Sequence, residues 1–329
     1  MDHEIRELQE QITKESRILS PLRAEISKVI VGQKDMVEKI LIGLLSNGHI
    51  LIEGVPGLAK TLMVSTLAQA LDTDFKRIQF TPDMLPADLT GTMIYNQKTG
   101  EFQVKKGPIF SSIILADEIN RAPAKTQSAL REAMQDRQVT IGDHTFPLDS
   151  SFLVIATQNP IEQHGTYPLP EAQIDRFMMK LKLSYPSKEE EYSILKIHGS
   201  GTRIDVSSVL NKKDLEKAKE VIHQVYIDEK IERYIVDIAS ATRNPEEYEL
   251  AEIKDLIAYG ASPRASLYLK IGSKANAFLS GRGYVIPDDI RDIGYDILRH
   301  RLILTYEAQA EDITTEDVIE KIFMGVEVP

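Results

Sequence analysis

Cysteine is absent from the 329-residue chain, which excludes a disulfide framework, a thiolate zinc site and a cysteine nucleophile. Long apolar runs are absent too, since none approaches the roughly 18 residues that a membrane-spanning helix needs. The first residues, MDHEIRELQEQ, are charged rather than apolar. We therefore expect a soluble, cytoplasmic protein without a membrane span.

Positive charge is scarce relative to negative charge. The chain carries 50 Asp and Glu against 39 Lys and Arg, a formal net charge of −11. Non-specific binding to nucleic acid depends on a positive field, so this balance argues against a nucleic-acid partner. A local basic groove would still be compatible with it.

Several signatures of enzyme chemistry are missing as well. The seven histidines are scattered and form no H-E-x-x-H motif, which argues against a transition metal held by the protein. There is no G-x-S-x-G nucleophile elbow, and no G-x-G-x-x-G opens a dinucleotide site. The function must therefore be sought in the patterns that are present.

Between residues 31 and 184, short apolar runs alternate with helical stretches, which indicates a mostly parallel sheet covered by helices. The expected strands are Ile50–Ile52, Ile78–Phe80, Ile113–Leu115, Phe152–Ala156 and Met178–Leu183. Residues 1–28 read as a helical arm broken at Pro21, and residues 29–184 as an αβα core. Residues 185–329 then form a smaller, all-helical domain, with a hinge at residues 184–188 around Pro186.

Helical spacing and end signals mark the elements of this second domain. Apolar residues recur at helical spacing from Leu215 to Val225 and from Ile231 to Ile238. Ser262-Pro263 predicts a helix start and Gly281 its end, Pro287 opens another helix, and Thr314 and Thr315 cap a last one.

The segment Gly54-Val-Pro-Gly-Leu-Ala-Lys-Thr61 lies between an apolar run and a helix-prone stretch. Such a strand–turn–helix presents backbone N–H groups and the positive end of a helix dipole to a phosphate chain. Lys60 would reach the β- and γ-phosphates, and Thr61 would contact Mg²⁺. Ala59 replaces the second glycine of the motif; a positive φ there would cost about 1–2 kcal/mol, whereas a right-handed conformation would accept alanine freely. Taken alone, an ordinary turn that happens to contain Lys-Thr is the alternative.

Two further strands end in polar residues. The apolar run 113–116 leads into Asp117 and Glu118, and the run 152–156 leads into Asn159-Pro160. Ligands of open α/β sheets lie outside this strand edge. Asp117 could hold Mg²⁺ or its waters, Glu118 could polarise the attacking water, and Asn159 could bind a phosphate oxygen and that water without adding charge. The alternatives are a chance pair of acids and a plain Asn-Pro turn.

In this order, and followed by a helical domain, these motifs resemble the P-loop NTPases of the AAA+ class, and within them the MoxR family. Matching segments run from about residue 25 over nearly the whole chain. They are Val31-Gly-Gln33, 54–61, Phe80-Thr-Pro-Asp-Met-Leu-Pro-Ala-Asp-Leu-Thr-Gly91, Asp117-Glu-Ile-Asn-Arg-Ala-Pro-Ala124, Glu132-Ala-Met-Gln-Asp-Arg-Gln-Val139, Ala156-Thr-Gln-Asn-Pro160, Leu169-Pro-Glu-Ala-Gln-Ile-Asp-Arg-Phe177 and Ser262-Pro-Arg-Ala265. The family also carries alanine at position 59, and the departures, such as Asp136 and Ile174, are conservative.

The resemblance implies a role for each matching residue, with ATP and Mg²⁺ as cofactors. The catalytic residues would be Glu118, Asn159, Arg176 and Arg264. Arg264 would be sensor 2 in the lid domain and would contact the γ-phosphate of its own subunit. Arg176 would be the arginine finger that acts on the ATP of the neighbouring subunit. Thr61 and Asp117 would hold Mg²⁺, partly through water. The nucleotide would be bound by Val31, Gly32 and Gln33 near the adenine and by Gly54, Pro56, Gly57, Leu58, Ala59, Lys60, Thr61 and Leu62 around the phosphates.

Other assignments for the arginines stay open. Arg121 and Arg131 are rivals for a contact with the neighbouring subunit, and Arg176 could instead form a surface ion pair with Asp175 or Glu171. Two expected hairpins interrupt the alternation of strands and helices, at residues 92–104 and 139–148. In related proteins similar insertions project toward the ring pore or a partner.

The function implied is that of an ATP-hydrolysing chaperone that works as a ring, expected to be a hexamer. It would remodel, mature or assemble a client protein, often with a von Willebrand factor A domain protein as partner. A nucleotide-gated scaffold with negligible turnover and a DNA-acting AAA+ motor are the alternatives.

Overall fold

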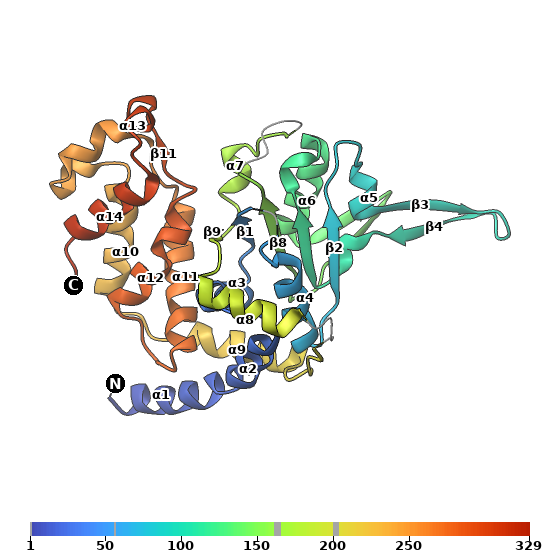
Figure 1. Ribbon diagram of the computed structural model, residues 1–329, viewed down its shortest axis with the longest axis horizontal. Helices are drawn as coiled ribbons and strands as arrows, with labels where there is room; N and C mark the ends of the chain where they lie inside the picture. The colour runs from blue at the N-terminus through green and yellow to red at the C-terminus, as the bar shows by residue number, and fades with distance from the viewer. Residues whose placement is uncertain (1, 56, 161–165, 200–203) are drawn as a thin grey trace.

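The computed structural model describes residues 2–55, 57–160, 166–199 and 204–329, with side chains from residue 8 onward. Five parallel strands form the central sheet in the order β2-β5-β8-β1-β9 (Figure 1). They are β1 (Ile50–Glu53), β2 (Phe75–Gln79), β5 (Ile113–Asp117), β8 (Leu153–Gln158) and β9 (Met179–Lys182). Each of the five expected apolar runs overlaps a strand, although β2 begins three residues before Ile78 and ends before Phe80. The order in space departs from the chain order at β1, the first strand of the chain, which lies between β8 and β9.

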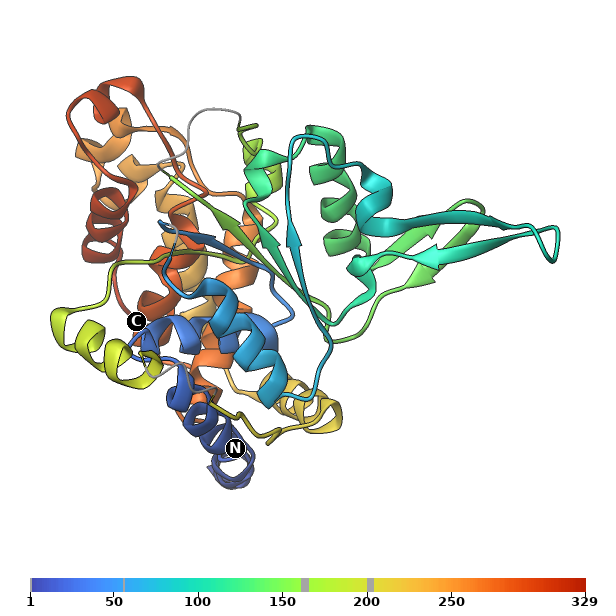
Figure 2. The ribbon, with the colours of Figure 1, turned by 45° about the vertical axis from the view of Figure 1, so that its right-hand side comes forward.

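Alternate residues of the strands enter two apolar cores, as the two-residue period of a strand requires. Ile50 and Ile113 belong to one core, whereas Leu51 and Ile114 belong to the other. Figure 2 shows helices on both sides of the sheet. The first face packs against α2 (Leu19–Val29), α3 (Lys34–Leu45) and α4 (Lys60–Ala70), and the second against α5 (Pro86–Thr90) and α6 (Ala124–Asp136). A short α7 (Glu171–Ile174) precedes β9.

The N-terminal arm consists of α1 (Asp2–Ser16) and α2. The expected break at Pro21 was misplaced, because the interruption lies at residues 17–18 and Pro21 sits in the first turn of α2. A proline is tolerated there, since the first N–H groups of a helix have no intrahelical acceptor. The arm runs along the helical domain (Figure 1), where the Gln9 side-chain amide donates to the carbonyl of Gly281 over 2.7 Å.

The second domain, predicted to be all-helical, is mostly helical, and the three helices with predicted start signals begin at Pro263, Pro287 and Thr315. They are α8 (Lys188–His198), α9 (Lys212–Gln224), α10 (Glu229–Ala241), α11 (Pro263–Leu279), α12 (Pro287–Leu298), α13 (Tyr306–Ala310) and α14 (Thr315–Gly325). Short 3₁₀ helices span Pro108–Phe110, Ile119–Arg121, Pro245–Tyr248 and Ala251–Leu256. The domain also contains a small antiparallel sheet that the sequence did not predict, formed by β10 (Ile257–Tyr259) and β11 (Ile303–Leu304). Strands of this length are too short for a period-two pattern to be recognised.

Both expected hairpins are present. The first pairs β3 (Gly91–Asn96) with β4 (Glu101–Lys106), and the second pairs β6 (Gln138–Ile141) with β7 (His144–Pro147). The β3–β4 hairpin projects far from the body of the molecule (Figure 1). Within the described residues, every helix is too short or too polar to traverse a lipid bilayer.

Candidate functional site

The loop between β1 and α4 turns sharply before the helix begins at Lys60. Gly57 has φ +88°, and Ala59 has φ +54° and ψ +23°, a left-handed conformation. Of the two conformations that the sequence left open for Ala59, the strained one is therefore adopted, at a cost of about 1–2 kcal/mol. A Cβ atom at Gly54 would come within 2.8 Å of Leu183 Cβ, so the loop also needs a glycine where it passes β9. Pro56 lies outside the described residues.

The start of α4 faces a polar cavity of about 460 Å³. The loop residues from Gly57 to Leu62, Asp117 and Glu118 of the β5 end, and Asn159 after β8 all line it. The ammonium group of Lys60 donates to the carbonyl of Gly54 over 2.6 Å. Burial lowers the pKa of Lys60, and the nearby charges of Asp117 and Glu118 oppose that shift. One cavity thus gathers most of the predicted phosphate-binding residues, though not Gly54, with the predicted metal-binding and water-orienting residues.

The two acids at the end of β5 are held by residues from the strands on either side. From β8, the hydroxyl of Thr157 donates to Asp117 Oδ1 over 2.6 Å and accepts from the backbone N–H of Glu118 over 2.9 Å. That second bond holds Glu118 in a left-handed conformation, with φ +56°. From β2, Arg77 donates to Asp117 Oδ2 and Gln79 donates to Glu118 Oε2.

Thr157, Arg77 and Gln79 were not recognised in the sequence as site residues. Arg77 and Gln79 stand two positions apart on β2, as residues on one face of a strand do. This spacing identifies them as site residues only when β2 is known to lie beside β5. Arg121, a rival for a contact in trans, forms an ion pair with Glu118 of its own subunit over 3.1 Å.

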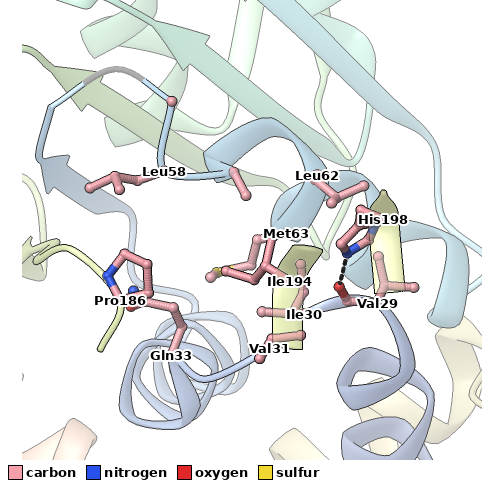
Figure 3. A pocket seen from close by; sticks show the side chains of 12 residues that line it. Val29, Ile30, Val31, Gln33, Leu58, Leu62, Met63, Pro186, Ile194 and His198 are labelled. Atoms are coloured by element: carbon pink, nitrogen blue, oxygen red, sulfur yellow. Dashed lines mark hydrogen bonds between the residues drawn. The ribbon is translucent and has the colours of Figure 1, made fainter. Parts of the chain in front are cut away.

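A second, mostly apolar pocket of about 240 Å³ opens beside the polar cavity (Figure 3). The two cavities share Gly57, Leu58, Ala59 and Leu62. Met63 of α4 also lines the pocket. The remaining lining residues come from the end of α2 and the segment that leads into α3, from Pro186 before α8, and from α8 itself. They are Val29, Ile30, Val31, Gln33, Pro186, Ile194 and His198. A flat apolar ring fits such a pocket, with its attached phosphates lying in the polar cavity.

Of the three residues expected near the adenine, Val31 and Gln33 line this pocket and Gly32 does not. Gly32 has φ +66°, and a Cβ atom there would lie 2.2 Å from Glu190 Oε1 of α8. The α8 residues Ile194 and His198 were missed, because the sequence does not reveal that α8 folds back over the core. His198 Nε2 lies 2.9 Å from the carbonyl oxygen of Val29, as the dashed line in Figure 3 marks.

Arg176 and Arg264 do not line the phosphate cavity. Arg264, at the start of α11, pairs with Asp175 over 2.6 Å, and the Ser262 hydroxyl also donates to Asp175. Arg264 thus lies beside Arg176, and it pairs with the carboxylate that was considered as a partner for Arg176. Its expected contact with the phosphates of its own subunit stays an untested prediction.

Arg176 donates to neutral oxygens, Oε1 of Gln135 and the carbonyl of Ala172. Partial burial lowers its pKa, and the positive charges of Arg131 and Arg264 lower it further. The guanidinium group of Arg176 is therefore repelled by those of Arg131 and Arg264, and the carboxylates of Asp175 and Asp136 partly oppose this effect. Such a cluster favours an incoming anion.

The carboxylate of Asp175 is also held from behind by Arg301, whose side chain is almost fully buried and donates to Asp175 Oδ1 over 2.9 Å. Burial lowers the pKa of Arg301 to about 10. Arg301 also donates to the carbonyls of Asp175 and Phe177, and His300 Nε2 lies 3.0 Å from the latter. The helical domain thus holds the segment that carries Arg176 through an ion pair and several hydrogen bonds.

Comparisons with known proteins identify the family of the chain. Residues 49–179 match the model of the "ATPase family associated with various cellular activities (AAA)", and residues 250–322 match the AAA lid domain. Chaperone MoxR1 of Mycobacterium tuberculosis is 49% identical over 93% of this chain and 81% of its own length. The uncharacterized protein YeaC of Bacillus subtilis is 46% identical over 92% of both chains.

Among solved structures, a candidate ATPase from Cytophaga hutchinsonii is 53% identical and superposes with a TM-score of 0.93 over 99% of both chains. The resemblance therefore extends through both domains, and not only through the phosphate loop. The chain belongs to the MoxR family of AAA ATPases.

Proposed function

We propose that this protein hydrolyses ATP in the polar cavity, with the adenine in the adjoining apolar pocket. The observation that carries the proposal is the convergence of Lys60, Asp117, Glu118 and Asn159 on one cavity that shares its loop with a base-sized pocket. A scaffold that only binds nucleotide would need the loop and the pocket, but not an acid placed to orient water.

Each residue then has a chemical task. The N-terminus of α4 and the ammonium group of Lys60 stabilise the negative charge of the phosphates. Glu118 orients the attacking water, while the neutral amide of Asn159 binds this water and a phosphate oxygen. The hydrogen bond from Glu118 N–H to Thr157 fixes the direction in which the glutamate enters the cavity.

The residues also fit Mg²⁺. The Thr61 hydroxyl and the Asp117 carboxylate are hard oxygen donors that line the same cavity. A cation there would be bound by one carboxylate, one hydroxyl, phosphate oxygens and water. When bound, Mg²⁺ would neutralise charge on the β- and γ-phosphates.

We further propose that Arg176 and Arg264 act on the ATP of a neighbouring subunit in a ring, for which a hexamer is the expected form. Neither lines its own phosphate cavity, and both lie with Arg131 in a cluster that favours an anion. Arg301 and His300 of the helical domain bind the carbonyls of residues 175 and 177. These contacts support the proposal that movement of the helical domain shifts the arginine cluster. An isolated subunit would then be a poor ATPase.

The work of hydrolysis is proposed to be the remodelling or assembly of a client protein, with a von Willebrand factor A domain protein as the expected partner. The β3–β4 hairpin supports a client contact, because Tyr95 and Phe102 pair across it with ring centroids 5.3 Å apart while their side chains remain 53% and 65% exposed. Large exposed apolar groups on a projecting element are typical of interaction sites.

The decisive experiment replaces Glu118 with Gln in the full chain. Binding of a fluorescent ATP analogue should be retained and phosphate release should fall by at least about 100-fold, because the variant keeps the cavity but loses the charge that orients water. Glu229→Gln, at an exposed ion pair with Arg233 in α10, is the matched control and should leave both measurements unchanged. Wild-type protein that binds ATP without releasing phosphate, even in its assembled form, would instead support the scaffold.

A further inference from the structure

Both oxygens of the proposed metal ligand Asp117 are occupied in the structure. Oδ1 accepts from the hydroxyl of Thr157 over 2.6 Å. Oδ2 accepts from Nε and Nη2 of Arg77 over 2.9 and 2.6 Å. An arginine therefore places its full positive charge on the carboxylate oxygen that a metal ion or its water would use.

Arg77 is held in that position from a second direction. Its Nη2 also donates to Oε1 of Gln79 over 2.8 Å, and the amide of Gln79 donates to Oε2 of Glu118 over 2.7 Å. Both residues come from β2, whose parallel register places Gln79 directly beside Asp117. The arginine is thus part of a continuous chain of polar contacts between the two acids, rather than a loose surface side chain.

The position of Arg77 also allows its side chain to move away from Asp117. Strand β2 is the edge strand of the sheet, and the Arg77 side chain is 49% exposed, whereas that of Asp117 is 16% exposed. An exposed arginine loses little when it exchanges a carboxylate for water, because solvent screens such pairs. Asp117 cannot move in the same way, because Thr157 holds it from inside the sheet.

From these contacts we infer that Arg77 competes with Mg²⁺ for Asp117 and thereby sets the metal dependence of nucleotide binding. The inference rests on the proposed function, since it takes Asp117 as the metal ligand. Arg77 and a divalent cation cannot both occupy the same side of Oδ2, and their like charges repel. In the absence of metal, the guanidinium instead supplies positive charge in a cavity that must accept a polyphosphate.

Removal of the guanidinium should weaken ATP binding without metal but strengthen the binding of Mg²⁺. Without metal, the affinity for ATP should fall, because one cation has left the phosphate cavity. In the presence of nucleotide, the concentration of free Mg²⁺ at half-maximal binding should also fall, because Asp117 no longer has to be released by Arg77. A side chain that merely stabilises the edge of the sheet would produce neither change.

The test is a fluorescence titration of a methylanthraniloyl-labelled ATP onto the full-length chain, first in EDTA and then over a series of buffered free Mg²⁺ concentrations. For Arg77→Gln we expect the Mg²⁺ midpoint to fall roughly fivefold or more, the usual lower range for coupling between two ligands. Arg77→Lys keeps the charge without the two-point contact and should give an intermediate midpoint. Lys76→Gln, an exposed cation at the preceding position of β2, should leave the midpoint unchanged.

The outcomes separate this inference from the proposed function. A midpoint for Arg77→Gln that equals or exceeds the wild-type midpoint, in a variant with wild-type thermal stability, overturns the competition. If Arg77→Gln has lost thermal stability, the Arg77→Lys variant decides instead. Its Mg²⁺ midpoint must then lie below the wild-type midpoint, and a midpoint that does not would overturn the competition. Wild-type protein that binds no nucleotide at any Mg²⁺ concentration overturns the proposed ATP site itself, and the role of Arg77 with it.

Discussion

The hydroxyl of Thr157 is a direct link between β8 and Asp117, to which it donates a hydrogen bond over 2.6 Å. The same oxygen accepts from Glu118 N–H. Thr157 is 1% exposed, so water cannot replace either contact without a rearrangement of the sheet edge. A single buried hydroxyl therefore orients both acids of the proposed catalytic site.

Thr157→Val keeps the shape of the side chain and removes both bonds. We expect the turnover of ATP to fall about 10- to 100-fold, because Glu118 N–H loses its acceptor and both acids lose their fixed orientation. Steady-state phosphate release measures the effect. Thr157→Ser retains the hydroxyl and should stay within about threefold of the wild type. Equal turnover in the Val and wild-type proteins would show that the two bonds have no catalytic role.

Complementation between subunits tests the assignment of Arg176 and Arg264 to a neighbour's site. Glu118→Gln alone should lose at least about 100-fold in turnover. The double variant Arg176→Ala/Arg264→Ala alone should lose about 10³-fold or more. A 1:1 mixture should recover about a quarter of the wild-type rate, since that share of random contacts in a ring joins an intact cavity to an intact arginine pair.

The control for this mixture is the triple variant, which carries all three substitutions in one chain, mixed with the Glu118→Gln protein. No subunit there has an intact cavity, so activity should not return. Failure of the first mixture to recover activity, with both proteins assembled, would place the two arginines outside the neighbour's site.

Backbone strain at Ala59 gives a prediction for stability. Ala59→Gly removes the Cβ that opposes φ +54° and should raise the free energy of unfolding by about 1 kcal/mol. Ala24, which is exposed in α2, provides the opposite control, because a glycine there should lower the stability by about the same amount. Urea unfolding followed by circular dichroism measures both. Destabilisation by Ala59→Gly would mean that the left-handed backbone stores no strain.

Much of the fold could be predicted because its signals are local. The apolar run before Asp117 and the one before Asn159 are each visible within a few residues, as are the Ser262-Pro263 and Thr314 helix starts. Pro21 was misread for the same reason. Only the length of the helix that follows decides whether a proline ends one helix or lies in the first turn of the next.

The remaining features of the site depend on which elements become neighbours. Nothing near Arg77 or Thr157 in the sequence indicates that their strands flank β5, so their contacts with Asp117 could not be anticipated. The same holds for His198, which reaches the pocket because α8 folds back over the core, and for Arg264, which lies beside Arg176 rather than at its own phosphate loop.

The sequence by itself determined the local features: a glycine-rich loop between a strand and a helix, acids and an amide at strand ends, and a chain that alternates strands with helices before a helical domain. Local steric preference and apolar periodicity encode these features within short segments. The tertiary structure alone decided which side chains hold the acids and that Arg264 pairs with Asp175 beside Arg176. Those relations arise from packing between segments up to some 90 residues apart, and no local pattern specifies them.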